Sequence, residues 1–407
     1  MTPPPPGRSP WHGAATPDEL QHFTAIAERV AEKLAVDVVE RDRENSLPFA
    51  PLELLREEGL ANLLVPEEFG GHGAHWETAF AVTRVIARVD ASIAQILGYS
   101  YLNQACIAFY GDDLDVQADW YRRSAAGSWL WADSFNPVSP DLTFTADGDN
   151  YRLSGLKRFA TGAAVADVII SGAVASGGAL DGELVVFAIE GSREGVEHVD
   201  DWDNVGYRAS ASGSVRYVDV VVTPADIIGV DRDEPFSSVV TPGVQLLFGN
   251  VYLGIAEGAL EQAKTLTLKR PNAWFLSGVD KYSEDPITHR LFGELVASTV
   301  AVEALADKLN RSYDVAVERG LDTTAEQRAQ LEISIAQLKV VSTEVALEVS
   351  NRVFELAGAS ATRSSIGLDL HWRNARTHTL HDPLDYKKIE VGANFLTGAV
   401  QPVSLYT

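Results

Sequence analysis

The sequence predicts an α+β protein with an N-terminal helical domain, a central β-barrel or sandwich domain and a C-terminal four-helix bundle. Three observations lead to this order. Apolar residues recur every three or four positions near the N-terminus, short β-branched runs bounded by Gly, Ser and Asp occupy the middle, and long stretches rich in Ala, Leu, Glu and Val follow Pro242. Helices segregated from a block of strands are typical of the α+β class.

The N-terminal helical domain is expected over residues 16–127, after a Pro-rich lead at 1–15 that is expected to be disordered. Residues 16–19, Thr-Pro-Asp-Glu, supply a cap residue, a proline in the first turn and acids at the positive end of the helix dipole. Further helical patterns cover residues 52–55 and 79–93. This part of the chain is therefore predicted to be helical throughout.

The central β domain is expected over residues 128–235. Ala-Asp-Gly-Asp-Asn at 146–150 is a hairpin signal between two short apolar runs. Strands are predicted on either side of it and later in the domain, at 142–145, 151–153, 168–170, 184–189 and 215–222. Lys157 lies on a predicted strand, and we expect it to be a salt-bridging cation at the surface rather than a catalytic amine.

The C-terminal bundle is expected over residues 236–407. Long helices are predicted at 246–268, 285–320 and 324–357, and Gly358 supplies a stop signal for the third. Two shorter helices are predicted over 366–376 and after Pro383.

Composition restricts the class of protein. The net charge of −24 disfavours binding to nucleic acid, because an acidic surface repels phosphate backbones. Cys106 is the only cysteine, so no internal disulfide can form, which fits a reducing cytoplasm. The first ten residues lack the apolar region of a secretory signal, and the apolar stretch at 165–174 is shorter than the ~20 residues of a membrane span. We therefore expect a cytoplasmic protein without a membrane partner.

Three motifs together resemble those of the acyl-CoA dehydrogenases. Residues 66–71, Pro-Glu-Glu-Phe-Gly-Gly, are similar to the P-E-x-x-G-G loop that ends the early helices of that family. Residues 155–167 resemble the strand and loop that contact its flavin, and Asn-Ala-Arg at 374–376 resembles its late R-D-A-R helix. The resemblance covers residues 16–407 and implies the acyl-CoA dehydrogenase-like fold.

The dehydrogenase base is missing from this pattern. Dehydrogenases carry Y-E-G-T after the late helix, and its Glu abstracts the substrate α-proton, whereas residues 380–383 read Leu-His-Asp-Pro. Residues 355–361 also depart from the Q-x-x-G-G-x-G segment that contacts the adenine of FAD, and residues 134–141 depart from T-E-P-x-A-G-S-D. Loss of the base and of the adenine contacts argues against an FAD-dependent acyl-CoA desaturase.

The same departures resemble the flavin-dependent monooxygenases of this fold, typified by dibenzothiophene monooxygenase and related two-component N- and S-oxygenases. Residues 373–383 and 270–278 carry this likeness. It implies FMN reduced by a separate NAD(P)H-dependent flavin reductase, and a homotetramer. It also implies transfer of one oxygen atom from O₂, through a C4a-hydroperoxyflavin, to a small apolar substrate, with organosulfur compounds as a candidate class.

His381 is the leading catalytic candidate. Imidazole titrates near pH 6.5, so it can both donate and accept a proton near neutrality, and in this family it would protonate or hold the flavin peroxide. The alternative is a structural histidine that pairs with Asp382 or a helix end. His378 lies three residues earlier and would share a helix face with His381. No third ligand stands at a familiar spacing from the two histidines, so no metal is expected.

The resemblance also assigns residues to the flavin and to the substrate. Thr161 takes the place of a hydroxyl that hydrogen-bonds the flavin ring, and an ordinary strand-end threonine is the alternative. Arg270 would bind the flavin phosphate in a forked geometry, although it could instead be a helix-end cation. These monooxygenases carry a histidine after Gly-Tyr, and this chain has Ser100 at that position. The catalytic set is His381, Thr161 and His378; the cofactor set is Thr161, Gly162, Asn136, Trp202, Arg270, Phe275, Arg373 and Arg376; the substrate-pocket set is Ser100, Trp131, Phe135 and Phe159.

Several alternatives stay open. Each pocket aromatic could be an ordinary core residue, and Arg373 and Arg376 could pair with acidic side chains instead of phosphate. The chain could also be an FAD-dependent acyl-CoA dehydrogenase or oxidase with a displaced base, an N-hydroxylating member of the same family, or a catalytically silent flavin-fold scaffold. No Gly-x-Gly-x-x-Gly follows a predicted strand, so nicotinamide oxidation is assigned to the separate reductase.

Overall fold

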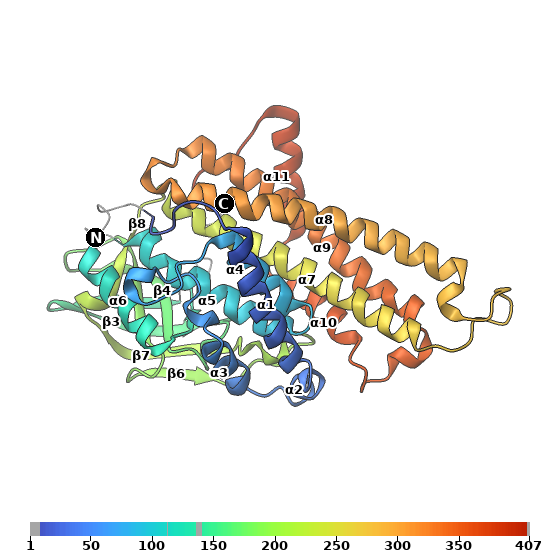
Figure 1. Ribbon diagram of the computed structural model, residues 1–407. Helices are drawn as coiled ribbons and strands as arrows, with labels where there is room; N and C mark the ends of the chain where they lie inside the picture. Colours follow the sequence, from blue (N-terminus) through green and yellow to red (C-terminus); the bar gives the residue numbers. More distant parts are fainter. Residues whose placement is uncertain (1–8, 112, 136–140, 405–407) are drawn as a thin grey trace.

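The computed structural model describes residues 9–404 except 112 and 136–140, and it confirms the α+β class. Helices precede and follow a central sheet (Figure 1). The N-terminal helices are α1 (Pro17–Leu34), α2 (Val38–Glu44), α3 (Phe49–Glu57), α4 (Trp76–Ala87), α5 (Ala91–Tyr110) and α6 (Leu114–Gly127). Helix α1 begins as predicted, because the Thr16 hydroxyl accepts a hydrogen bond from the backbone N–H of Glu19 at 3.1 Å.

Two expectations for this domain are wrong. The helical pattern at 79–93 is two helices, because the Asp90 carboxylate accepts from the N–H of Ile93 at 3.1 Å and starts α5. The lead is ordered over its described residues. The Trp11 side chain is 5% exposed, donates to the carbonyl of Leu64 at 3.1 Å and packs edge-on against Trp76. Burial of an indole stabilises this segment; residues 1–8 lie outside the described part of the chain.

The central domain is one sheet of eight strands. They are β1 (Trp131–Asp133), β2 (Leu142–Asp147), β3 (Asn150–Lys157), β4 (Val168–Ser176), β5 (Leu184–Glu190), β6 (Val196–Val199), β7 (Ser214–Val222) and β8 (Ile227–Asp231). Their order is β6-β7-β3-β2-β4-β5-β8, with β1 parallel to β4. The hairpin at 146–150 forms as predicted, with Asp147 opposite Asn150. The short strands β1, β6 and β8 were not predicted.

Lys157 is not at the surface. It ends β3 opposite Val215 of β7, and only 3% of the residue is exposed. Burial lowers the pKa of its ammonium group, and the nearby Asp141 carboxylate opposes that shift. The expectation of a surface cation is therefore wrong, because the strand pairing turns this side chain into the interior.

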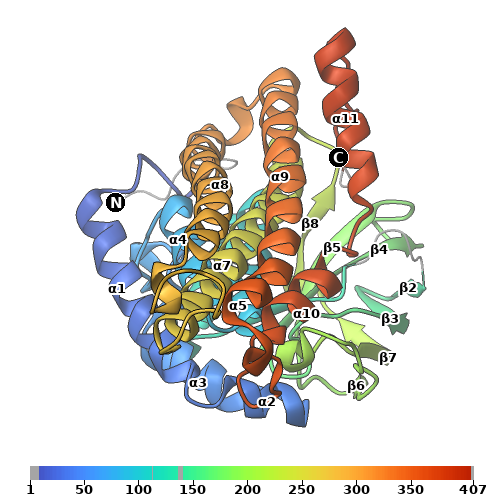
Figure 2. The same cartoon turned by 90° about the vertical axis from the view of Figure 1, so that its right-hand side faces the viewer.

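The C-terminal domain is built on three long helices that run side by side (Figure 1). They are α7 (Val240–Leu268), α8 (Pro286–Glu318) and α9 (Ala325–Ala357), followed by the shorter α10 (Asp369–His378) and α11 (Leu384–Thr397). Helix α10 lies between the long helices and the sheet, and α11 projects from the body (Figure 2). The buried ammonium of Lys387 joins α11 to α9 through Glu332.

Helix α7 explains one further feature of the sequence. With its preceding turn, residues 237–268, it is long and apolar enough to cross a membrane by length and composition, unlike the stretch at 165–174. Most of it is buried against α4, α5, α8 and α9. A core helix passes the same test, so its apolar character is accounted for by packing.

Candidate active site

The end of α10 brings two histidines together. The N–H of His381 donates to the carbonyl of His378 at 2.9 Å, and the two imidazole rings lie parallel with centroids 5.7 Å apart. Tyr252 of α7 places its hydroxyl 2.9 Å from Nδ1 of His378. Phe248, one turn earlier on α7, packs edge-on against both imidazoles. The two histidines therefore lie side by side against α7, but α10 ends at His378 and His381 follows in the turn, so the predicted shared helix face is wrong.

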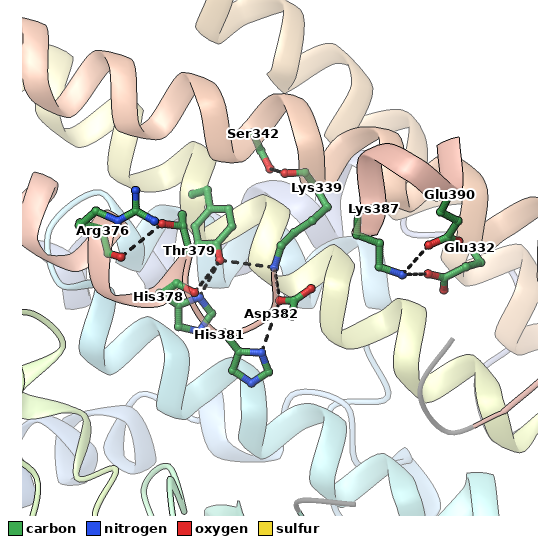
Figure 3. Close-up of polar contacts among 11 residues, drawn as sticks. Glu332, Lys339, Ser342, Arg376, His378, Thr379, His381, Asp382, Lys387 and Glu390 are labelled. Atoms are coloured by element: carbon green, nitrogen blue, oxygen red, sulfur yellow. Dashed lines mark hydrogen bonds and ion pairs between the residues drawn. The ribbon is translucent and has the colours of Figure 1, made fainter. Parts of the chain in front are cut away.

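A buried ion pair orients His381 (Figure 3). The Lys339 ammonium on α9 is 1% exposed and lies 2.9 Å from Oδ1 of Asp382. The same oxygen lies 3.4 Å from Nδ1 of His381. We call His378, His381, Asp382 and Lys339 the histidine cluster. Because Nδ1 of His381 faces a carboxylate, its Nε2 is the atom left for proton chemistry.

Burial and neighbouring charges shift the pKa values of three members of the cluster, Asp382, Lys339 and His378. Burial opposes ionisation of Asp382, but the hydrogen bond with His381 and the charge of Lys339 outweigh it and hold the pKa of that carboxyl far below its usual value. Burial lowers the pKa of Lys339, and Asp382 opposes that shift. Burial, reinforced by the charges of His381 and Lys339, holds the pKa of His378 well below its usual value. His378 is thus a neutral hydrogen-bonding residue.

A second carboxyl faces this cluster from β1. Burial raises the pKa of Asp133 to about 6, although a hydrogen bond from Asn103 and the charge of His381 oppose the shift. Nδ2 of Asn103 lies 3.4 Å from that carboxylate. Burial and the charge of Asp133 also raise the pKa of Tyr99, so its phenol stays protonated. Tyr99 packs against Phe248 at 6.1 Å between ring centroids.

Sequence reasoning missed most of these partners. Two of the missed residues are close in sequence to residues that were chosen: Asp133 follows Trp131 by two positions, and Tyr99 precedes Ser100 by one. Lys339 had a signal, because a lysine on the apolar face of a long helix is costly to bury without a partner. That partner, Asp382, comes from a turn 43 residues later and is recognisable only in three dimensions.

The sheet contributes a neutral half of the site. Oγ1 of Thr161, in the loop after β3, lies 3.0 Å from Oγ of Ser212. The indole of Trp202 donates to the carbonyl of Tyr207 at 2.8 Å. The Tyr207 ring lies 5.0 Å from the imidazole of His378, so these loops adjoin the histidine cluster. Thr161 and Trp202 are therefore brought near the histidines as the resemblance implied.

Two neighbours of Thr161 have unusual backbones. Gly162 adopts a φ of 75°, and its N–H donates to the carbonyls of Ser210 and Ala211. Phe159 adopts a φ of 61° and leaves 65% of the residue exposed, edge-on to Trp202. A left-handed phenylalanine is a strained conformation of the kind found at ligand sites.

Three members of the predicted substrate pocket are packing residues here. Trp131 is 1% exposed, and its indole donates to Ser124. The Ser100 hydroxyl accepts the N–H of Trp131 at 2.9 Å, so it anchors the start of β1. Phe135 covers Gly172 of β4, where a Cβ would come within 2.0 Å of its ring. Ser100 and Trp131 are therefore ordinary core residues, which was the alternative stated for the pocket. Asn136, predicted to contact the cofactor, lies outside the described residues.

The predicted phosphate ligands separate into different environments. Arg373 is committed to Asp42 and Asp369, at 2.6 and 2.8 Å, and to a backbone carbonyl. A guanidinium neutralised by two carboxylates is not available to a phosphate, so the structure contradicts that role for Arg373. The Nε of Arg376 is buried and has no hydrogen-bond partner among the described residues. Arg376 therefore remains a candidate anion ligand near Tyr252.

Arg270 and Phe275 lie elsewhere in the protomer. They belong to the loop between α7 and α8, at the far end of the long helices (Figure 1). Tyr252, which contacts His378, precedes the end of α7 by 16 residues, or about 24 Å at 1.5 Å per residue. The Arg270 guanidinium stacks on Tyr282, and Phe275 is 78% exposed. One protomer therefore does not bring this loop to Thr161.

The residues present fit a flavin. Nε2 of His378 and the hydroxyl of Tyr207 are buried without a hydrogen-bond partner among the described residues, and each costs free energy unless a ligand or water satisfies it. Next to them lie the exposed ring of Phe159, the indole of Trp202 and the hydroxyl of Thr161. An aromatic surface bordered by such polar atoms matches a planar heterocycle with a polar edge.

Comparisons with known proteins identify the family of the chain. Three profiles match the chain: acyl-CoA dehydrogenase, N-terminal domain, over residues 16–128; middle domain, over 134–220; and C-terminal domain, over 246–386. The chain is 36% identical over 371 residues to the probable FMNH2-dependent monooxygenase SfnC of Pseudomonas putida, which covers 90% of this chain and 93% of that protein.

Two further matches have similar coverage. Dibenzothiophene monooxygenase of Rhodococcus erythropolis is 35% identical over 389 residues, covering 92% of this chain and 93% of that protein. The crystal structure of FMN-bound TdsC from Paenibacillus sp. A11-2 has a TM-score of 0.91 and 34% identity, covering 95% of this chain and 100% of that chain. The described fold is thus similar to that of flavin-dependent monooxygenases.

Proposed function

Because this chain belongs to the acyl-CoA dehydrogenase family, in the branch of its FMNH2-dependent monooxygenases, we propose that it oxygenates the sulfur atom of a small apolar compound. The chain is a reduced-flavin-dependent monooxygenase that uses FMN and O₂. One feature of the site argues against the alternatives that the sequence left open, a dehydrogenase with a displaced base among them.

That feature is the imidazole of His381, which contacts the carboxylate of Asp382, which in turn pairs with the buried ammonium of Lys339. It stands in the segment where dehydrogenases carry their glutamate base. An imidazole hydrogen-bonded to Asp382 can donate or accept a proton at Nε2 without a change in the ionisation of Asp382, whose pKa is held low. This arrangement suits the delivery and recovery of a proton during oxygen transfer.

The other side chains have simpler roles. FMN, when bound in its reduced form, supplies the activation of O₂, which amino acid side chains do not supply. Phe248 packs edge-on against His381, and Tyr99 packs behind Phe248, so these two rings cover one side of the imidazole. His378, which stays neutral, holds Tyr252 through Nδ1 and offers Nε2 to a bound group. Thr161 offers its hydroxyl from the sheet.

The substrate class follows from the lining of the site. Tyr99 and Phe248 give it an aromatic wall, which favours an apolar molecule. Asp133 faces His381, and above about pH 6 its negative charge disfavours an anionic substrate. These observations support a neutral sulfide or thiophene in preference to a sulfinate. Dibenzothiophene, which names several of the relatives, is the natural probe.

We further propose a homotetramer in the cytoplasm, supplied by an NAD(P)H-dependent flavin reductase. The position of Arg270 and Phe275 supports assembly, since their loop reaches a flavin only in a second copy of the chain. Exposed Trp274 and Leu276 on the same loop would be covered by such a contact. Light scattering of the purified protein should give four chains per particle, and a monomer would contradict this part of the proposal.

The function can be tested with isotopic oxygen. The protein, FMN, NADH and a flavin reductase are mixed with dibenzothiophene under ¹⁸O₂, and the products are analysed by mass spectrometry. We expect one ¹⁸O atom in the first product and no label when ¹⁸O is supplied as water. Bleaching of bound flavin by an acyl-CoA, with no labelled product from sulfide or amine probes, would instead identify a dehydrogenase.

A further inference from the structure

Three buried hydroxyls form a row that begins at Thr161 in the sheet domain. Oγ1 of Thr161 lies 3.0 Å from Oγ of Ser212, which lies 2.7 Å from Oγ of Ser210. The row ends at the backbone carbonyl of Tyr207, 2.7 Å from Oγ of Ser210. We call Thr161, Ser212 and Ser210 the hydroxyl chain.

The carbonyl fixes the direction of every hydrogen bond in the chain. A carbonyl oxygen only accepts, so Ser210 donates its one proton to Tyr207. Ser212 must then donate to Ser210, and Thr161 must donate to Ser212 for the row to be complete. A second contact, from Oγ of Ser212 to the carbonyl of Ser210 at 3.4 Å, draws the Ser212 proton in the same direction. Thr161 is left with lone pairs only.

The backbone holds this row in place. The N–H of Ala160 donates to the carbonyl of Gly213 at 3.0 Å, and Gly162 donates to the carbonyl of Ser210 at 3.1 Å. These bonds tie the loop after β3 to the segment that follows η3 (Arg208–Ser210) on both sides of Thr161. Rotation of the Thr161 hydroxyl toward a ligand would break a buried hydrogen bond.

An acceptor-only hydroxyl distinguishes the two redox states of a flavin. N5 of reduced flavin carries a hydrogen and donates, whereas N5 of oxidised flavin is an acceptor. We propose that Thr161 contacts N5 of bound FMN and that the hydroxyl chain thereby makes the site selective for reduced FMN, because Thr161 can accept from N5–H but cannot donate to oxidised N5. This inference rests on the proposed function, and it assigns to Ser210 and Ser212 the role of positioning residues that set the hydrogen-bond direction of Thr161.

The test is anaerobic titration of the protein with oxidised and with photoreduced FMN. Wild type should bind reduced FMN more tightly. In Ser212→Ala the Thr161 hydroxyl loses its acceptor and can donate to oxidised N5. The Kd of oxidised FMN divided by the Kd of reduced FMN should therefore fall about three- to tenfold. The midpoint potential of bound FMN should fall in parallel, by about 30 mV for each tenfold loss of preference.

Two more variants sharpen the result. Ser210→Ala should lower the ratio less, since Ser212 keeps the Ser210 carbonyl as an acceptor, and it serves as the second variant if Ser212→Ala does not fold. Ser214→Ala is the matched control. The Ser214 hydroxyl is also buried, but it donates to Asp201 at 2.6 Å and is not a member of the hydroxyl chain. It should leave the ratio unchanged.

The outcomes separate the inference from the function it rests on. An unchanged ratio in Ser212→Ala, or in Ser210→Ala where that variant alone folds, overturns the inference. Loss of the preference in the Ser214→Ala control also overturns it. An unchanged ratio in Thr161→Val shows that Thr161 does not contact N5 and overturns it too. Absence of FMN binding by the wild type in either redox state would instead contradict the proposed function.

Discussion

The two halves of the site use different chemistry. The helical half, the histidine cluster, contains a buried ammonium, a carboxylate and two imidazoles, whereas the sheet half, the hydroxyl chain, contains no charge. The pKa of an ionisable group in a partly buried site depends on the charges of its neighbours, so the helical half is suited to proton transfer. Hydroxyl groups keep their protons near neutral pH, so only the direction in which each one donates its hydrogen bond can change. The comparison indicates that one half moves protons while the other recognises the cofactor.

The largest effect is expected from His381→Ala. Removal of a positioned acid–base group costs about 10²- to 10³-fold in turnover, so product formation should fall by that factor. FMN binding should stay within about twofold, because the sheet half is untouched. The measurement is the ratio of oxygenated product to released H₂O₂. His289→Ala, an exposed histidine on α8, is the control, and normal product yield in His381→Ala would remove this residue from the mechanism.

The buried ion pair should dominate the stability of the helical half. Lys339→Met leaves Asp382 without its cation, and breaking a buried pair by removal of one partner typically costs about 3 kcal/mol. Urea unfolding measures this loss, and Lys339→Met with Asp382→Asn should recover part of it. Lys388→Met, which removes an exposed pair with Glu344, should change stability by less than about 0.5 kcal/mol. Equal losses of stability in Lys339→Met and Lys388→Met would contradict the distinction between a buried and an exposed ion pair.

The arginines test where the phosphate binds. Arg270→Ala should weaken FMN binding about tenfold, because a charged hydrogen bond contributes about 1.5 kcal/mol or more. Arg373→Ala should change FMN affinity less than about threefold but lower the melting temperature, since Arg373 holds Asp42 and Asp369. Fluorescence titration and thermal melting separate the two effects. The reverse pattern would place the phosphate at α10 of the same protomer.

The last prediction concerns the dependence of stability on pH. The pKa of Asp133 is raised to about 6 by burial, so the folded state binds this proton more tightly than the unfolded chain, whose carboxyl titrates near about 4. Stability should therefore fall as pH rises from about 4 to about 6. Asp133→Asn should remove the part that Asp133 contributes, which is about 1.4 kcal/mol for each unit by which its pKa is raised. Asp314, whose pKa burial also raises to about 6, keeps its own contribution in that variant. Identical pH profiles of wild type and Asp133→Asn would contradict this assignment.

Local signals predicted the elements better than the contacts. Thr16 caps its helix as predicted because its hydroxyl accepts the N–H of Glu19, a relation contained in four consecutive residues. The break at Asp90 was missed because the apolar pattern runs through it. The burial of Lys157 and of Trp11 was missed because a side chain's exposure depends on segments far away in the chain.

The sequence alone determined the order of helices and strands, the loss of the dehydrogenase base and the choice of His381, because periodicity, capping and motif spacing are short-range properties. The tertiary structure decided which side chains join His381, since Lys339, Tyr252 and Asp133 come from three distant elements. It also decided that Arg373 is neutralised and that Arg270 lies apart. Such pairings depend on how elements pack in space, and no local pattern encodes that packing.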